Sequence, residues 1–141
     1  MNVTALAREA NTTAETVRHY TDLGLLRPSR NPDNGYRVYG RDDLQRLRFA
    51  LSARSLGFTL SDVSTLVEAA DAGGSPCPQT RALIEQRLAD VEAQIAELQR
   101  LSARMRDAMA QWSAQPDCQP GDEAHICALI ESFDPAAGAR K

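Results

Sequence analysis

Residues 3–24, VTALAREANTTAETVRHYTDLG, predict two short helices joined by a tight turn. Apolar residues recur at helical spacing over 3–10, and Asn11 tolerates the left-handed backbone of a turn. Thr13 is a favourable N-cap for the second helix, and Gly24 is the glycine that commonly follows a helix end. The stretch therefore predicts a helix-turn-helix, a motif that by itself is shared by many helical proteins.

A hairpin is expected directly after these helices. Leu25–Pro28 and Tyr36–Tyr39 are short runs that favour extended structure, and the loop between them ends in Asn34 and Gly35. An Asn-Gly pair beside a β-rich run is typical of a hairpin turn. A hairpin that follows a helix-turn-helix in this way forms a wing.

Two further helices are expected, over residues 42–55 and from Thr59 to about Ala70. Thr59 and Asp62 have the spacing of a capping box at the start of the second one. Residues 71–74, which contain two glycines, form a linker to the rest of the chain.

One long helix is then predicted from residue 75 to Trp112, because no Gly or Pro occurs after Pro78. Its apolar residues recur in alternating steps of four and three, the spacing of a coiled-coil seam. The seam comprises Ile84, Leu88, Val91, Ile95, Leu98, Ser102, Met105, Met109 and Trp112. One small domain cannot bury so long a stripe, so we expect a second copy to cover it; the alternative is a helix folded back on its own domain.

The C-terminal part is expected to be less regular. Residues 117–123, DCQPGDE, are rich in turn formers, and residues 125–133 predict a short helix with Ile126, Leu129, Ile130 and Phe133 on one side. Residues 135–141 are expected to form a loose tail.

Charge divides the chain into two unlike halves. The net charge of the 141 residues is −3, which by itself argues against a nucleic-acid partner. Residues 1–58, however, carry +3 and residues 59–141 carry −6. A basic front half joined to an acidic rear half indicates two separate roles on one chain.

Hydropathy and motifs exclude several classes of protein. No apolar stretch approaches the ~20 residues of a membrane span, and residues 1–10 do not have the form of a signal peptide. We therefore expect a cytoplasmic protein with no membrane partner. No nucleophile–base pair or paired carboxylates stand out, so we expect no enzyme.

Three segments carry the motifs of one known family: Thr16–Tyr20 followed by Leu23–Leu26, then Asn34–Tyr39, and then Leu47–Phe58. Together with the long helix they resemble the MerR family of bacterial transcription regulators over about residues 1–112, and the cysteines resemble its metal-sensing branch. The resemblance implies a mainly α protein with a winged helix-turn-helix DNA-binding domain at residues 1–74. A long antiparallel coiled-coil dimerisation helix at 75–113 and a metal-binding loop, short helix and tail at 114–141 would follow.

The resemblance makes the second helix the recognition helix in the major groove of promoter DNA. Arg18 can hydrogen-bond to guanine or to a phosphate, and Tyr20 to a phosphate. Thr13 and Glu15 lie at the start of this helix, where they could reach base edges. For His19 we expect packing or a phosphate contact.

The wing supplies the second set of expected DNA contacts. We expect Tyr36 and Tyr39 to share one face of the hairpin, with Arg37 on the other; the tyrosines suit phosphate contacts and hairpin packing equally. By resemblance, Arg54 at the end of the third helix contacts the DNA backbone. Family dimers bind a palindromic promoter and, on activation, bend and untwist it for RNA polymerase.

Three cysteines, all in the acidic half, are an odd number with no secretory context for disulfides. The 35 residues from Cys77 to Trp112 span about 50 Å in a straight helix, so Cys77 cannot reach Cys118 of its own chain. In an antiparallel dimer, Cys77 of one protomer would meet the loop of the other that carries Cys118 and Cys127. Two three-thiol sites would then lie across the dimer.

Three thiolates suit soft or borderline cations. Hg(II) and Pb(II) accept three sulfurs, whereas Zn(II) and Cd(II) favour a fourth ligand from His125, from Asp122 or Glu123, or from water. The resemblance favours a divalent metal, because family sensors of Cu(I), Ag(I) and Au(I) have serine at the position of Cys77. Cys118 follows the long helix by about six residues, later than in the family pattern. No organic cofactor is expected.

Together with these observations, the resemblance implies a homodimeric regulator that switches on resistance or efflux genes when metal binds. Two alternatives stay open. Cys118 and Cys127 could form a disulfide in a thiol or electrophile sensor of the same family, or zinc could merely stabilise a structural dimer. The basic winged half argues against the purely structural role.

Overall fold

The computed structural model describes residues 1–137 and divides into two compact units. The first unit is Met1–Leu88, and the second begins at Ala89, inside the longest helix. Residues 138–141 of the expected tail lie outside the described residues.

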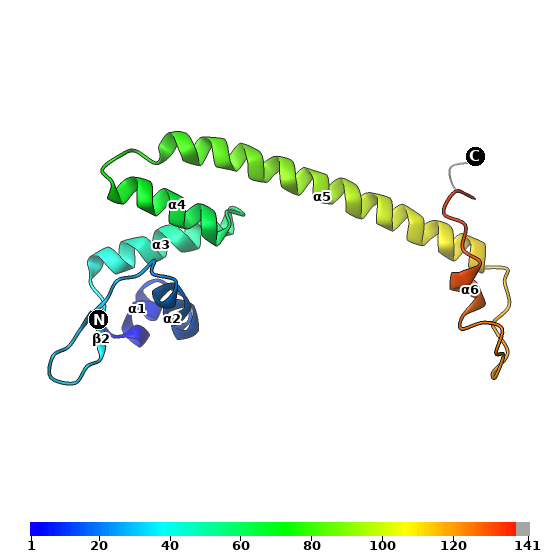
Figure 1. Ribbon diagram of the computed structural model, residues 1–141, viewed down its shortest axis with the longest axis horizontal. Helices are drawn as coiled ribbons and strands as arrows, with labels where there is room; N and C mark the ends of the chain where they lie inside the picture. Colours follow the sequence, from blue (N-terminus) through cyan, green and yellow to red (C-terminus); the bar gives the residue numbers. More distant parts are fainter. Residues whose placement is uncertain (138–141) are drawn as a thin grey trace. The chain divides into compact units, whose positions relative to one another are not determined.

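The first unit is a winged helix-turn-helix with two further helices (Figure 1). It contains α1 (Val3–Glu9), α2 (Ala14–Asp22), β1 (Ser29–Arg30), β2 (Arg37–Val38), α3 (Arg41–Ser55), α4 (Leu60–Asp71) and the beginning of α5 (Cys77–Trp112). The mainly α architecture expected from the sequence is confirmed.

Side-chain caps and left-handed residues set the ends of α1 and α2. The Thr13 hydroxyl oxygen accepts a hydrogen bond from the Thr16 amide at 3.1 Å and so caps α2. Asn11 adopts φ 58° in the turn between the helices, and Gly24 adopts φ 82° after α2. These local preferences explain why the helix-turn-helix was predictable from sequence.

The first strand lies later than predicted. The run 25–28 is not a strand, and β1 begins at Ser29. The amides of Leu25 and Leu26 instead donate to the Tyr20 carbonyl at 3.0 and 3.4 Å, closing the end of α2. Both leucines are buried, so they serve the core rather than the two-stranded antiparallel hairpin.

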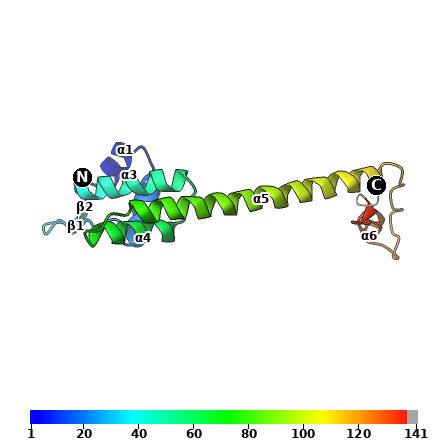
Figure 2. The same ribbon diagram turned by 90° about the horizontal axis from the view of Figure 1, so that it is seen from above.

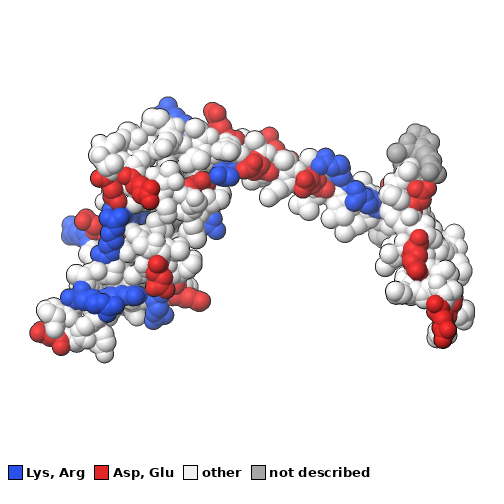
Figure 3. All heavy atoms as spheres, viewed as in Figure 1, with Lys and Arg blue, Asp and Glu red and all other residues white. Residues whose placement is uncertain are grey.

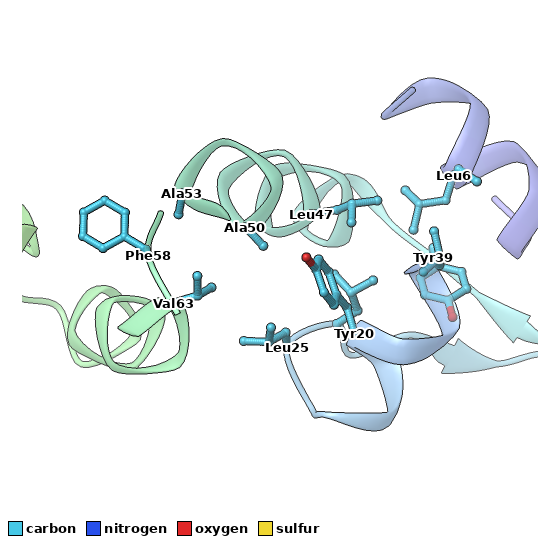
Figure 4. Close-up of a cluster of buried hydrophobic side chains, with 12 residues drawn as sticks. Leu6, Tyr20, Leu25, Tyr39, Leu47, Ala50, Ala53, Phe58 and Val63 are labelled. Atoms are coloured by element: carbon cyan, nitrogen blue, oxygen red, sulfur yellow. The ribbon is translucent and has the colours of Figure 1, made fainter. Parts of the chain in front are cut away.

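One cluster of buried apolar side chains holds the first unit together (Figure 4). Leu47, fully buried, lies on the inner face of α3 among residues from α1 and α2. Phe58 and Val63 are both buried on either side of the α4 N-cap, as a hydrophobic staple requires. The cluster comprises Leu6, Ala7, Val17, Tyr20, Leu25, Leu26, Tyr39, Leu47, Ala50, Ala53, Phe58 and Val63.

The second unit has a very different interior. It consists of the rest of α5, the following loop and α6 (Ala128–Glu131), which lies beside the C-terminal end of α5 (Figure 2). Ala108 is its one buried apolar residue within the described part of the chain. Seam residues such as Leu98 (64% exposed) and Met109 (69%) are uncovered. No helix among the described residues is long and apolar enough to cross a membrane.

The C-terminal helix is shorter than the predicted segment 125–133. Cys127 has extended backbone (φ −147°) and precedes the four-residue α6. Its amide donates to the Glu131 carboxylate at 3.1 Å, so the helical turn begins only after it. Ile126 therefore lies outside the helix and is 97% exposed, not on a common apolar face with Leu129.

Candidate nucleic-acid interface and cysteine site

The exposed face of α2 carries polar side chains without internal partners. Glu15, Arg18 and His19 are exposed, and Arg18 forms no ion pair or hydrogen bond with any residue of the described chain. Thr13 is engaged as the N-cap, with its oxygen also 2.9 Å from the Thr16 hydroxyl. The Arg18 guanidinium is thus available for an anion at the surface.

Tyr20 lies on the inner side of the same helix. Its ring points between α2 and α3 in Figure 4, and the residue is only 6% exposed. The ring centroid lies 6.0 Å from that of His19. Tyr20 is therefore a core residue, which leaves it little surface for the expected phosphate contact.

The two wing tyrosines do not share a face, which corrects the expectation. Tyr36 is 73% exposed, whereas Tyr39 is 1% exposed and its hydroxyl lies 2.7 Å from the Thr21 hydroxyl. The reason is the two-residue period of extended chain, which places residues three positions apart on opposite faces. Tyr39 packs in the core, and Tyr36 alone of the pair can meet a ligand.

The arginines of the wing make contacts within the fold in addition to giving the wing a positive charge. Arg37 is half-buried, and its Nη2 lies 3.8 Å from the Asp22 carboxylate at the end of α2. Arg30 donates from Nη1 to the Gly35 carbonyl at 2.9 Å, which closes the hairpin loop. Figure 3 shows basic side chains across the hairpin and the neighbouring helices of this unit.

Arg54 also has a partner inside the fold. Its Nη1 donates to the Phe58 carbonyl at 2.8 Å, across the turn between α3 and α4. The residue as a whole remains exposed. The bond ties the end of α3 to the N-terminal flank of α4, a role that the sequence pattern did not reveal.

The cysteines fall in different units. Cys77 is exposed at the first position of α5, in the first unit. Cys118 and Cys127 are half-buried in the second unit, and the Ala128 amide donates to Cys118 Sγ at 3.0 Å. The loop thus brings the sulfur of Cys118 to the residue that directly follows Cys127, in spite of its late position after the helix.

A carboxylate organises the rest of this loop. Glu131 Oε2 accepts a hydrogen bond from the Cys127 amide at 3.1 Å and lies 3.6 Å from His125 Nδ1. His125 and Glu131 are both about half exposed. Among residues 1–137, no three His, Cys, Asp or Glu side chains lie close enough together to hold one ion. The expected set Cys77, Cys118, Cys127 and His125 is therefore not assembled within one chain.

Polar side chains at and just after the end of α5 hold this loop in place, a role that the sequence did not predict for Trp112, which was expected in the coiled-coil seam. Trp112 donates from its indole N–H to the Leu129 carbonyl at 2.7 Å. Gln111 and Gln115 add hydrogen bonds to Asp134 and Ser132 at 2.9 and 3.1 Å. The available signal was Trp112 itself, because a partly buried indole N–H requires an acceptor.

Comparison with known proteins identifies the family. The model described as "MerR HTH family regulatory protein" matches residues 1–70, and that described as "MerR, DNA binding" matches residues 44–108. The HTH-type transcriptional regulator ZntR of Escherichia coli K12 is 31% identical over 140 residues, covering 96% of this chain and 94% of the relative. The chain belongs to the MerR family of transcription regulators.

Its relatives within the MerR family include metal regulators. The mercuric resistance operon regulatory protein of Shigella flexneri is 32% identical over 138 residues, covering 98% of this chain and 90% of the relative. The transcription regulator PbrR691 from Ralstonia metallidurans CH34, solved in complex with lead(II), matches with a TM-score of 0.73 and 25% identity. That match covers 95% of this chain and 99% of the solved one. The resemblance to the metal-sensing branch of the MerR family is confirmed.

Proposed function

We propose that this MerR-family protein is a homodimeric, metal-responsive regulator that acts on promoter DNA in the cytoplasm. A divalent soft metal would bind Cys77 of one protomer together with Cys118 and Cys127 of the other. Binding would lead the dimer to distort the promoter so that RNA polymerase transcribes resistance or efflux genes. Residues 1–74 would bind DNA, residues 75–113 would form the dimer, and residues 114–141 would contribute to the metal site.

The observation that carries the metal site is the hydrogen bond from the Ala128 amide to Cys118 Sγ. It holds one sulfur beside Cys127, and an N–H directed at sulfur suits a thiolate ligand. The donor set matches the metals: thiolates are ligands for soft and borderline cations. Cys77 is exposed at the start of α5, where a second chain can reach it.

His125 is the candidate fourth ligand. Its Nδ1 faces the Glu131 carboxylate, which leaves Nε2 as the nitrogen free to bind a metal. With His125 the site would suit Zn(II) or Cd(II), and without it Hg(II) or Pb(II).

The DNA interface would be built on α2 and the wing. We propose Arg18 and Arg37 as phosphate or base contacts, with Glu15, His19 and Tyr36 exposed beside them. Thr13 and Arg54 would add contacts from groups that the fold has already positioned. Tyr20 and Tyr39 would support this surface from the core.

The seam of α5 would be the dimer interface. Leu88, Val91, Ile95, Leu98, Met105 and Met109 are all more than two-fifths exposed in the single chain. A continuous apolar stripe with coiled-coil spacing is stabilised by burial against a second helix.

The shared site can be tested with mixed dimers. Reduced protein is titrated with Zn(II), Cd(II), Hg(II), Pb(II) and Cu(I), and thiolate–metal absorbance is followed. The wild type should bind two ions per dimer, and the Cys77→Ser and Cys127→Ser homodimers none. A dimer of one Cys77→Ser protomer and one Cys127→Ser protomer retains a single complete site and should bind one ion.

Three outcomes would contradict the metal proposal. A mixed dimer that binds no ion would place each site within one chain. If Cys77→Ser homodimers bind metal as the wild type does, Cys77 is not a ligand. A reduced wild type that binds no metal but forms a Cys118–Cys127 disulfide would favour the thiol sensor.

The DNA interface is tested separately with Arg18→Ala and Arg37→Ala. Each should weaken operator binding and reduce the slope of log affinity against log salt concentration by about two per homodimer, because one guanidinium is lost from each protomer. Arg81→Ala, an exposed arginine on α5, is the matched control. Unchanged affinity in both test variants would refute the proposed docking.

A further inference from the structure

The Asp62 carboxylate has two roles at the start of α4. In the capping box, the Thr59 amide donates to Asp62 Oδ2 at 2.9 Å and the Asp62 amide donates to Thr59 Oγ1 at 3.0 Å. The same carboxylate accepts two hydrogen bonds from Arg87 of α5, from Nε to Oδ2 at 2.8 Å and from Nη2 to Oδ1 at 3.0 Å. One buried group therefore joins the first turn of α4 to α5.

The Asp62–Arg87 pair is well shielded from water. The side chain of Asp62 is 8% exposed and that of Arg87 is 25% exposed. The Arg87 hydrogen bonds, aided by those from Thr59, lower the pKa of Asp62 although burial opposes the shift. Two parallel bonds from a planar guanidinium fix orientation as well as distance, which a single contact does not.

The pair lies far from the connection between the two helices. α4 ends at Asp71 and α5 begins at Cys77, and the residues between them include Gly73 at φ 87°. Asp62 precedes the end of α4 by nine residues, about 14 Å along the helix. A short glycine-containing connection sets the angle between two helices loosely, whereas a bond at this distance from it sets the angle firmly.

The pair also lies at the edge of the first unit. Leu83 and Ile84 of α5 pack against the core cluster of the DNA-binding unit. Arg87 follows them by one turn, and the first unit ends at Leu88. The Asp62–Arg87 pair therefore lies at the point where α5 extends beyond the packed core of the first unit.

We propose that the Asp62–Arg87 pair is a positioning pair that restricts the dimer to one spacing of operator half-sites. It does so by fixing the angle between α4 and the first turns of α5. In a dimer joined through α5, that angle determines where each recognition helix is presented, and half-site spacing follows from protein geometry. The inference rests on the proposed dimeric, DNA-binding function.

The test measures spacing preference, because a residue that serves stability alone would not change it. Operators are selected by the full-length wild type from a pool of random duplex DNA. Each is then shortened or lengthened by one or two base pairs at its centre. Affinities are measured by fluorescence anisotropy at fixed salt for the wild type, Arg87→Met and Arg87→Lys.

Arg87→Met keeps an apolar stem and removes the guanidinium, and Arg87→Lys keeps the charge but not the bidentate geometry. Arg81→Met, at an exposed position of the same helix, is the matched control. Circular dichroism and the molar mass in solution verify that each variant is folded and dimeric. If Arg87→Met does not fold, Arg87→Lys decides the test.

The wild type and Arg81→Met should lose about tenfold or more in affinity when the spacing changes by two base pairs, because both half-sites must be engaged together. Arg87→Met should lose about threefold or less on the same change and bind the selected operator almost as well as the wild type. Arg87→Lys should fall between them.

Folded variants that keep the wild-type spacing preference would overturn the inference and leave the proposed function intact. The same holds if affinity falls equally on every operator, or if Arg81→Met also becomes tolerant of spacing. A wild type that binds no duplex would overturn the proposed function and the inference with it.

Discussion

The two units of this chain bury their apolar residues in opposite ways. In Met1–Leu88, side chains from α1 to α4 and the wing form a cluster of buried apolar residues, although others such as Leu23 and Leu56 remain exposed. From Ala89 onward, Ala108 is the one buried apolar residue within the described chain, and the seam faces outward. The comparison shows that the first unit has its own core, whereas the second needs a partner to complete one.

The polar contacts of the two units differ in the same way. In the first unit the Asp62–Arg87 pair is largely buried and joins two packed helices. In the second unit the His125–Glu131 contact is longer, at 3.6 Å, and about half exposed. The Asp62–Arg87 pair is held inside the fold, whereas the side chains of His125 and Glu131 remain accessible to a ligand or a second chain.

The largest effect is expected for a charge placed in the seam. Leu98→Glu, at a position 64% exposed in the single chain, would bury a carboxylate from each protomer in the proposed dimer. The dissociation constant of the dimer should rise roughly a thousandfold, which corresponds to about 4 kcal/mol. Analytical ultracentrifugation over a dilution series measures it. Ala93→Glu adds the same charge off the seam and should not change the mass; a dimeric Leu98→Glu would remove the seam as the interface.

A core truncation should affect the first unit next most strongly. Leu47→Ala removes a fully buried side chain, which costs about 3 kcal/mol in the free energy of unfolding. Urea unfolding followed by circular dichroism measures the loss. Leu56→Ala, at a position 64% exposed, should change stability by less than about 0.5 kcal/mol. Equal losses in the two variants would contradict the assignment of the core.

Acidification should remove a smaller contribution that the Asp62 carboxylate makes to the free energy of unfolding. Hydrogen bonds from Arg87 and Thr59 lower its folded pKa below the ordinary 3.8. The unfolded state therefore takes up the proton first, and the contribution is present above about pH 3.8 and lost as pH falls through the folded pKa.

The measurement is urea unfolding of the wild type and Asp62→Asn between pH 7 and pH 2. At neutral pH the wild type should be more stable by about 1–3 kcal/mol, because Asn pairs less strongly with Arg87. The difference should narrow below about pH 4 as the wild-type carboxylate becomes protonated. A constant difference over the whole range would show that the charge of Asp62 does not contribute.

The smallest effect is expected in the loop before α6. Ile126→Ser changes a side chain that is 97% exposed, so the stability of the protein alone should change by less than about 0.5 kcal/mol. Thermal unfolding followed by the fluorescence of Trp112, the one tryptophan, reports on this unit. A large drop in melting temperature would mean that the second unit buries Ile126 in solution, which would contradict its exposed position in the loop.

Much of the fold followed from local sequence preferences. The Thr13 cap, the turn at Asn11 and the capping box of Thr59 and Asp62 each depend on residues a few positions apart. The start of β1 did not follow, because the burial of Leu25 and Leu26 depends on helices elsewhere in the chain. Extended and turn conformations compete closely there, and packing decides between them.

The candidate sites were less predictable than the fold. The resemblance implied a phosphate contact for Tyr20, and the sequence left either a phosphate contact or hairpin packing for Tyr39; both residues are buried in the core. The partner of Arg54 lies in the turn after α3 and that of Arg87 lies in the preceding helix, α4, and neither pairing is encoded by a motif. The approach of Cys118 to the residue after Cys127 likewise depends on how Trp112, Gln111 and Gln115 hold α6.

The sequence by itself determined the helices, the wing turn, the seam on α5 and membership in a metal-sensing branch of the MerR family. The helices, the turn and the seam depend on short-range spacing, which governs caps, turns and helical periodicity, whereas the family was identified by resemblance to its motifs. Only the tertiary structure decided which tyrosine faces outward, which arginine is already engaged and which carboxylate joins α4 to α5. Each of these depends on contacts between residues far apart in the chain, and burial makes such contacts strong by removing competing water.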